Sequence, residues 1–335
     1  MPPSQDKDTV SYDLIVLGSG IAGLAAAAAA QKDGKSVLVI DKGERLGGRI
    51  SARQKGRLTF NHGAQFFTAR GKKFATVLAE AKHAGNLKDW QISPNKIVQI
   101  GTPSMLNFPQ FMALDIDIRQ HIEITNISHL GSDIAFFSNT DLIAKGRQAI
   151  ITAPAAQSAL LLNDIYPKLA ETAQLATYDP CWTVMLNLDK SIELSNESYD
   201  GAYPLRDEAA GIGFAVPEQI RFARGSLEQD IQTVALTIQA SGAWSRQYLQ
   251  EDPKFITMQL LGLWANLKGH SRPTVLSATT HRWLYAKVTD AADIDAPRQS
   301  NDGQLAIAGD WLSGPRVEQA FDSGLQAYQS LFKPR

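Results

Sequence analysis

The strongest constraint on the fold of this chain is the stretch YDLIVLGSGIAGLAAAAAA near its N-terminus, where an apolar run leads into three spaced glycines. The run is short and almost uninterrupted, which is typical of a parallel strand buried on both faces. The alanine-rich segment behind the glycines predicts a helix, and SVLVID, which ends at Asp41, predicts a second buried strand. Together these segments predict one complete strand–helix–strand unit of a nucleotide-binding fold.

Each glycine of GSGIAG has a physical role in such a unit. Gly18 allows the tight turn, Gly20 lets a pyrophosphate approach the backbone, and Gly23 lets the helix pack closely on the strands. The phosphates would lie at the N-terminus of the helix, beside Ile21 and Ala22. The alternative is a glycine turn that only joins a strand to a helix.

The residues at the end of the second strand favour dinucleotide binding over that alternative. Asp41, which Lys42 follows, is placed to accept hydrogen bonds from ribose hydroxyls, and its charge disfavours a 2′-phosphate there. The two strands, the helix and the acid together predict a dinucleotide site to which Asp41 and Lys42 contribute.

Composition restricts the class of protein and its partners. The 335 residues, 44 % of them hydrophobic and 20 % charged, predict a folded protein of two domains. The net charge of −1 gives no electrostatic reason to expect a nucleic acid or an anionic membrane as a partner. Acidic residues precede the first apolar run and glycines interrupt it, so neither a signal peptide nor a membrane span is expected. With one cysteine, Cys181, and no metal-ligand spacing, we expect no metal and a cytoplasmic location.

The segment KGERLGGRI after Asp41 bears on the identity of the dinucleotide. Its glycine pair, which ends at Gly48, would let the chain pass close to the dinucleotide, with Arg49 as a cation near the phosphates. The glycine motif, the acidic strand end and this GGR resemble the flavin-containing amine oxidase superfamily. The segment NHGAQFFTAR is similar to a GAQ-x-FT segment of the renalase-like branch. The resemblance implies that Ala64 and Gln65 lie at the flavin of a bound FAD.

The C-terminal end of the chain carries a second part of this resemblance. LAIAGD predicts a buried strand, and GPRVEQAFDSGLQAYQSL predicts a helix with a proline near its first turn. The pair resembles the C-terminal flavin motif of the superfamily, in which the helix N-terminus points at the flavin and stabilises its negative charge on reduction. The resemblance assigns to FAD the residues Gly309, Asp310, Arg316, Val317, Glu318 and Ala320.

Three further segments complete the expected site. In HIEITNISHL, the resemblance implies that the backbone of Ile127 contacts the adenine. HRWLYA also resembles renalase-like proteins and implies that Trp283 or Tyr285 lines the pocket beside the flavin; the alternative is that both belong to the core. GFAVPEQIRFARG departs from the Asn- and Lys-rich run of many relatives. There we expect Glu218 and Gln219 to contact the substrate.

These segments predict an α/β fold with two interleaved domains. An FAD-binding Rossmann-type domain, similar to that of glutathione reductase, is expected from residues 10–65, 100–160 and 270–335. An antiparallel sheet with helices, expected from residues 66–99 and 161–269, would form a substrate domain that covers the flavin.

The resemblance implies an FAD-dependent oxidase of a small molecule, with O2 as electron acceptor and H2O2 as product. FAD is expected to bind without a covalent bond, because the C-terminal flavin motif contains no cysteine. Renalase relatives oxidise isomeric dihydro forms of NAD(P), a reaction that requires no general base at the donor carbon. One alternative is amine oxidation, which needs a neutral amine and usually an aromatic cage. The other is a flavin-binding protein without turnover.

Overall fold

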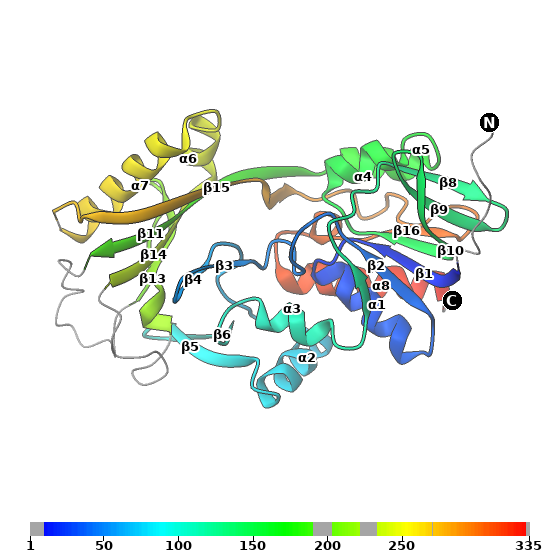
Figure 1. Cartoon of the computed structure of the whole chain (residues 1–335), viewed down its shortest axis with the longest axis horizontal. Coiled ribbons are helices and arrows are strands. Elements are labelled where there is room, and N and C mark those ends of the chain that lie inside the picture. Colours follow the sequence, from blue (N-terminus) through cyan, green and yellow to red (C-terminus); the bar gives the residue numbers. More distant parts are fainter. Residues whose placement is uncertain (1–9, 190–202, 222–232, 270, 333–335) are drawn as a thin grey trace.

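The computed structural model describes residues 10–189, 203–221, 233–269 and 271–332 and shows two halves joined by long strands (Figure 1). One half holds the largest sheet, with helices on both faces. The other half holds a second sheet with helices α6 (Gly242–Gln247) and α7 (Pro253–Lys268). Strands β11 (Thr177–Asp189) and β15 (Val275–Asp290) run from one half toward the other.

The largest sheet is a Rossmann-type sheet of seven strands in the order β7-β2-β1-β10-β9-β8, with β16 also paired to β10. Strands β7, β2, β1, β10 and β16 are parallel, whereas β9 and β8 continue the sheet as an antiparallel hairpin. The strands are β1 (Ser11–Leu17), β2 (Val37–Ile40), β7 (Asp117–Arg119), β8 (Asn126–Leu130), β9 (Asp133–Ser138), β10 (Asp141–Ile151) and β16 (Leu305–Ile307).

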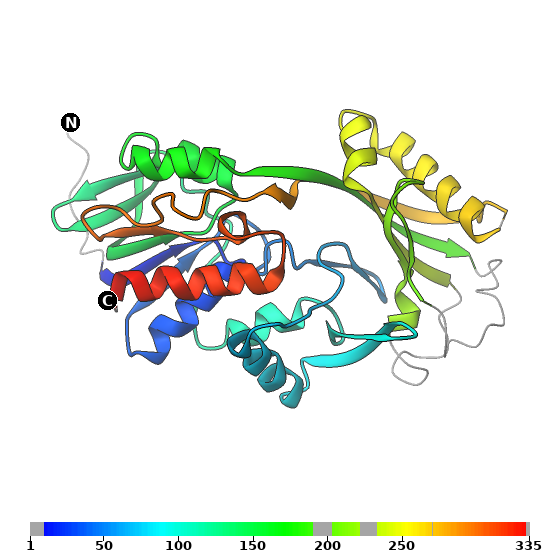
Figure 2. The same cartoon turned by 180° about the vertical axis from the view of Figure 1, so that it is seen from behind.

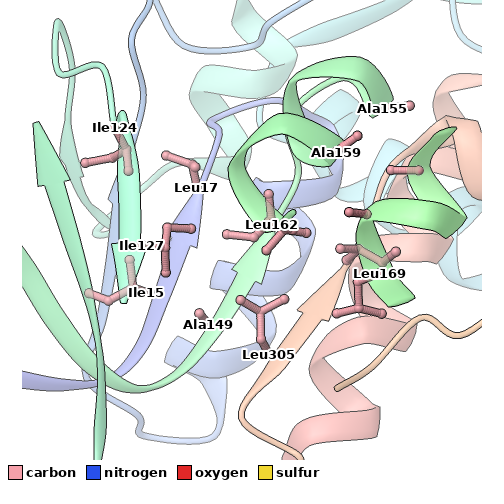
Figure 3. Packing of buried hydrophobic residues seen from close by; sticks show 14 of the residues in the cluster. Ile15, Leu17, Ile124, Ile127, Ala149, Ala155, Ala159, Leu162, Leu169 and Leu305 are labelled. Atoms are coloured by element: carbon pink, nitrogen blue, oxygen red, sulfur yellow. The ribbon is translucent and has the colours of Figure 1, made fainter. Parts of the chain in front are cut away.

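Strand β1 shows why this sheet is covered on both faces. Its side chains alternate between the faces, and all four residues at its C-terminal end are buried. Leu14 and Val16 pack against α1 (Ile21–Lys32) and α8 (Val317–Phe332). Ile15 and Leu17 pack toward α4 (Ala155–Leu162) and α5 (Pro167–Gln174), as Figure 3 shows around Leu162 and Leu169. The predicted α/β fold with a Rossmann-type domain is confirmed.

The alanines of α1 allow a close approach of α8, which lies alongside it (Figure 2). A Cβ added at Gly324 of α8 would clash with the backbone carbonyl of Ala22 in α1. Small side chains at this crossing therefore set the short distance between the two helices.

The second sheet is antiparallel, in the order β12-β13-β14-β11-β15. Its other strands are β12 (Leu205–Asp207), β13 (Ile212–Pro217) and β14 (Thr233–Ala240). Helix α7 packs its apolar residues on one face of this sheet. The helix begins after Asp252, whose side chain accepts a hydrogen bond of 2.7 Å from the Lys254 N–H, and ends at Gly269 with φ of +69°.

Two hairpins connect the halves of the molecule. Hairpin β3 (Ala52–Lys55) and β4 (Leu58–Asn61) places Leu58 and Phe60 against Met185 and Ala235 of the antiparallel sheet. Hairpin β5 (Leu87–Ser93) and β6 (Lys96–Gly101) joins α2 (Lys72–His83) and α3 (Asn107–Met112) in an apolar cluster that also contains Phe214 of β13.

The structure differs from the expected domain boundaries in two segments. The segment HRWLYA lies in β15, which pairs with β11 at the edge of the antiparallel sheet and not with the Rossmann-type sheet. Helix α5 lies beyond the expected boundary at residue 160, yet Leu169 packs in the core of the Rossmann-type sheet. Local sequence predicts that a segment is a strand or a helix, but not the sheet on which it pairs or packs. Neither assignment could therefore be made from the sequence of the segment alone. Among the described residues, no helix is long and apolar enough to span a bilayer.

Candidate functional site

The glycine turn after β1 forms an open backbone cradle. Gly18 has φ of +109°, and a Cβ at Gly23 would clash with the Gly18 carbonyl, so both positions require glycine. A Cβ at Gly20 would meet no atom within 4 Å. Ile21 and Ala22 open α1, whose N-terminus has no side-chain cap and no acidic residue in its first turn. These N–H groups and the helix dipole can hold a phosphate in front of Gly20.

Asp41 lies beside this turn with its carboxylate fixed. The Ser19 N–H and hydroxyl donate to its Oδ2 at 2.5 and 2.7 Å, and the Gly43 N–H donates to its Oδ1 at 2.6 Å. A carboxylate offers about four acceptor positions, so one remains for a ligand hydroxyl. Lys42 is exposed and pairs with Glu123 at 3.7 Å, so its side chain takes no part in this arrangement.

The GGR and GAQ segments lie next to the glycine turn. A Cβ at Gly48 would lie 3.4 Å from the Cα of Gly20, so the two backbones pass each other closely. The Ala64 N–H donates to the Arg49 carbonyl at 2.9 Å. The structure thus brings together three motifs that the sequence places up to 46 positions apart.

Arg49 and Asp310 join the N-terminal motifs to the C-terminal motif. Two hydrogen bonds of 2.7 and 2.6 Å link the guanidinium to the carboxylate, which follows Gly309 directly after β16. Burial lowers the pKa of Arg49, but Asp310 raises it by more, so its net pKa lies above the usual value. Arg49 Nη1 also donates to the Tyr285 carbonyl at 3.3 Å, and the Tyr285 ring packs edge-on against Tyr178.

The start of α8 is tied to the start of α2. The buried carboxylate of Glu318 accepts hydrogen bonds from the N–H groups of Arg70 and Gly71 at 2.7 and 2.5 Å. A negative charge at the N-terminus of α2 is favourable for the helix dipole, so these contacts favour a structural role for Glu318. One guanidinium nitrogen of Arg316 is buried without a hydrogen-bond partner among the described residues. The apolar cluster around α2 takes up the side chains of Val317 and Ala320.

Ile127 does not lie at the acidic strand end. Its side chain is buried in β8 and its backbone pairs with Phe136 of β9. The chain beside the nucleotide motif is instead an earlier segment, where the Ile122 N–H donates to the Asp41 carbonyl at 3.1 Å. No sequence motif singles out Ile122, and a contact of the Ile127 backbone with the adenine stays a prediction.

Gln65 and Glu218 belong to one buried network. Glu218 accepts hydrogen bonds from the Asn61 N–H and side-chain amide, both at 2.9 Å, and from the Thr237 hydroxyl at 2.5 Å. It also pairs with Arg221 at 2.8 Å, where the two side chains are 5 % and 1 % exposed. Arg221 donates to the carbonyl and the side-chain oxygen of Gln65. The network fixes the backbone around residues 61–65, and its contacts favour a positioning role for Glu218.

Gln219 points away from this network. Its side-chain nitrogen donates to the Thr233 carbonyl at 3.2 Å, and its oxygen is buried without a partner among the described residues. Residues 222–225 of the segment that begins at Gly213 lie outside the described residues. A direct contact of Gln219 with substrate stays a prediction.

A cluster of two histidines and a tryptophan, His62, His281 and Trp283, lies beside residues 63 and 64. The ring of His62 stacks on Trp283 with centroids 5.5 Å apart, and the Trp283 indole N–H donates to the His62 carbonyl at 3.0 Å. Burial, helped by His281 and Arg53, lowers the pKa of His62 to about 3. Burial and Arg53 also lower the pKa of His281. Both rings are therefore neutral at neutral pH, and sequence spacing gave no signal for their meeting.

Comparisons with known proteins agree with this geometry. Residues 16–81 match a family described as an NAD(P)-binding Rossmann-like domain. The fold is similar to cyclohexylamine oxidase from Brevibacterium oxydans IH-35A, with TM-score 0.70 and 14 % identity over 96 % of this chain and 99 % of that chain. It is also similar to a putative protoporphyrinogen oxidase from Exiguobacterium sp. 255-15, with TM-score 0.74 and 13 % identity over the same shares of the chains.

A third similar structure is putrescine oxidase bound to putrescine, with TM-score 0.69 and 12 % identity over 96 % of this chain and 99 % of that chain. At these identities the likeness establishes the fold. The resemblance to the renalase-like branch stays a prediction.

Proposed function

We propose that this chain binds FAD and catalyses the two-electron oxidation of a small molecule. The observation that carries the proposal is the meeting of the glycine turn, Asp41, the GGR segment and Asp310 in one place, although they span almost three hundred residues of sequence. The similar folds include proteins described as oxidases, which supports the same interpretation.

The residues present fit the cofactor. The open space in front of Gly20 and the uncapped N-terminus of α1 suit a pyrophosphate, and the remaining acceptor position of Asp41 suits a ribose hydroxyl. Arg49 and Asp310, which pair with each other, would hold phosphate and ribityl groups. The unpartnered guanidinium nitrogen of Arg316 is a donor that a bound flavin would satisfy. No cysteine lies in the motif around Asp310, so the binding is non-covalent.

When bound, FAD would supply the redox chemistry, the acceptance of a hydride equivalent from the donor and the reduction of O2 to H2O2 with a proton from solvent. The chain positions the donor and excludes water. The Glu218–Arg221 network holds residues 61–65 in place, and the stacked rings of His62 and Trp283 form an aromatic wall.

The protonation states of the side chains favour one class of donor. His62, with a pKa of about 3, is a weak base, and the Glu218 carboxylate is fully engaged by neighbouring groups. An isomeric dihydro-NAD(P) suits such a site, because loss of a hydride makes its pyridine ring aromatic and releases no proton from the donor carbon. We therefore propose a reduced nicotinamide isomer as the substrate.

Amine oxidation is the second candidate. Two of the similar structures are named for amine substrates, and the site contains the aromatic residues Trp283 and Tyr285. These two rings have different partners, however: Trp283 stacks on His62, whereas Tyr285 packs on Tyr178. They do not face each other as the walls of a cage would.

A binding experiment tests the proposal for the cofactor. The purified chain, titrated with FAD, should bind one equivalent and quench its fluorescence, and acid precipitation should leave the yellow colour in the supernatant. A chain that does not bind FAD would overturn the proposal, and a yellow pellet would refute non-covalent binding.

A further inference from the structure

A cavity of about 160 Å³ lies between hairpin β3–β4 and the antiparallel sheet. Its apolar floor is formed by Phe60 and Met185, which pack against each other in one cluster. Its remaining walls are polar, and none of the described residues that line it is acidic. The lining residues are Arg53, Gln54, Lys55, Phe60, Met185, Ser277 and Thr279.

The described side chains that line this cavity carry a net positive charge. Arg53 and Lys55 stand two positions apart on β3, and neither makes an ion pair or a side-chain hydrogen bond within the described residues. Two other exposed lysines have acidic partners: Lys42 pairs with Glu123 at 3.7 Å, and Lys82 pairs with Asp89 at 2.7 Å. Two cations and two hydroxyls around one cavity are the donor set that binds an anion.

Both sequence segments that line the cavity also lack acidic residues. No aspartate or glutamate occurs between Glu44 and Glu80, or between Asp252 and Asp290. The first interval contains hairpin β3–β4, and the second contains all of β15 before its last residue. The two strands that meet at the cavity therefore bring no acidic side chain to it.

Strand β15 links the cavity to the proposed flavin site. Alternate residues of a strand share one face, so Ser277 and Thr279 lie on the face of β15 that also carries His281 and Trp283. Thr279 is four residues from Trp283, about 13 Å along the strand. Burial and the positive charge of Arg53 lower the pKa of His281, so Arg53, which lines the cavity, also acts electrostatically on the ring cluster.

We propose that this cavity binds a phosphate group of the substrate and thereby selects a phosphorylated nucleotide donor over an amine. The cavity volume of about 160 Å³ is several times the share of about 30 Å³ that one water occupies, so a phosphate group fits in it. The same positive charge repels an ammonium group. This inference rests on the proposed function for its substrate class, but the anion site itself is tested separately.

The first arm of the test is direct binding of inorganic phosphate by calorimetry to the FAD-loaded protein. Wild type should bind phosphate at millimolar concentration, and Arg53→Gln and Lys55→Gln should each weaken binding at least tenfold. Arg57→Gln removes an equal charge from the hairpin at a position that does not line the cavity, so it should bind as wild type does. Absence of phosphate binding, or equal loss in all three variants, would overturn the proposal.

The second arm compares two donors, the dihydro isomers of nicotinamide mononucleotide and of nicotinamide riboside, which differ by one phosphate. Arg53→Gln should raise the half-saturating concentration of the mononucleotide at least tenfold and leave its limiting rate and both constants of the riboside unchanged. Equal effects on the two donors would refute the phosphate contact. If neither donor reduces the flavin, the proposed function fails, while the phosphate titration still decides the anion site.

Discussion

Removal of the Glu218 carboxylate should destabilise the protein strongly, because the buried guanidinium of Arg221 then loses its ion-pair partner. The two side chains are 5 % and 1 % exposed and their atoms lie 2.8 Å apart. Breaking such a buried pair from one side costs about 3–5 kcal/mol. Glu218→Ala also leaves donors of Asn61 and Thr237 without an acceptor.

The assay is thermal unfolding followed by circular dichroism. With an unfolding entropy of about 2.1 cal/mol/K per residue, 1 kcal/mol corresponds to about 1.4 °C of Tm for 335 residues, so the expected loss is about 4–7 °C. Gln219→Ala is the matched control. Among the described residues the Gln219 side chain makes one hydrogen bond, of 3.2 Å, so its loss should cost about 1 kcal/mol. Replacing both charges, as Glu218→Leu with Arg221→Met, should recover more than half of the loss, since no buried charge remains.

The opposite outcome would refute this reasoning. In that outcome the Tm of the Glu218→Ala variant lies within about 2 °C of wild type, and its half-saturating substrate concentration is raised. Glu218 would then contact the substrate, as the sequence alone suggested. The positioning role inferred from its contacts would then be wrong.

Three other outcomes follow from the structure. Asp41→Ala should weaken FAD binding by about one to two decades in a fluorescence titration, because a charge-assisted hydrogen bond to ribose is lost; unchanged affinity would remove Asp41 from the site. Gly20 has φ of −71° and open space in front of it, so Gly20→Val should keep the wild-type Tm but abolish FAD binding; a large loss of Tm would contradict the open cradle. Folding lowers the pKa of His62 to about 3, so the folded state loses stability as pH falls from 6.5 toward 3, where the unfolded state binds the extra proton. Over that range this loss is up to about 5 kcal/mol in the free energy of unfolding. His62→Gln should remove this part of the pH dependence, as measured by urea unfolding.

The nucleotide-binding unit was predictable because local rules determine it. The run before Gly18 has the apolar pattern of a buried strand, and the structure confirms the steric reasons for Gly18 and Gly23. The approach of a pyrophosphate to Gly20 stays a prediction. Spacing along the chain gives no indication that Arg49 meets Asp310, although the resemblance placed both residues at the cofactor.

The remaining parts of the site depend on long-range pairing. Glu218 meets Asn61 across 157 positions, and His62 stacks on Trp283 across 221 positions. No local periodicity encodes such contacts, since they arise only when hairpin β3–β4 docks on the antiparallel sheet. For the same reason, HRWLYA could be recognised as a motif, but the sheet to which it belongs could not be predicted.

Anaerobic mixing of the FAD-loaded protein with a panel of dihydronicotinamide isomers and simple amines tests the central claim most directly. Bleaching of the visible flavin band reports reduction, and later admission of O2 should restore the colour and produce H2O2. We expect rapid bleaching by a dihydronicotinamide isomer, with a limiting rate that varies little across neutral pH because no proton leaves the donor carbon. Bleaching by amines alone, with a rate that rises steeply as the amine deprotonates, would establish the amine oxidase alternative. A protein that stays yellow with every donor would contradict the account.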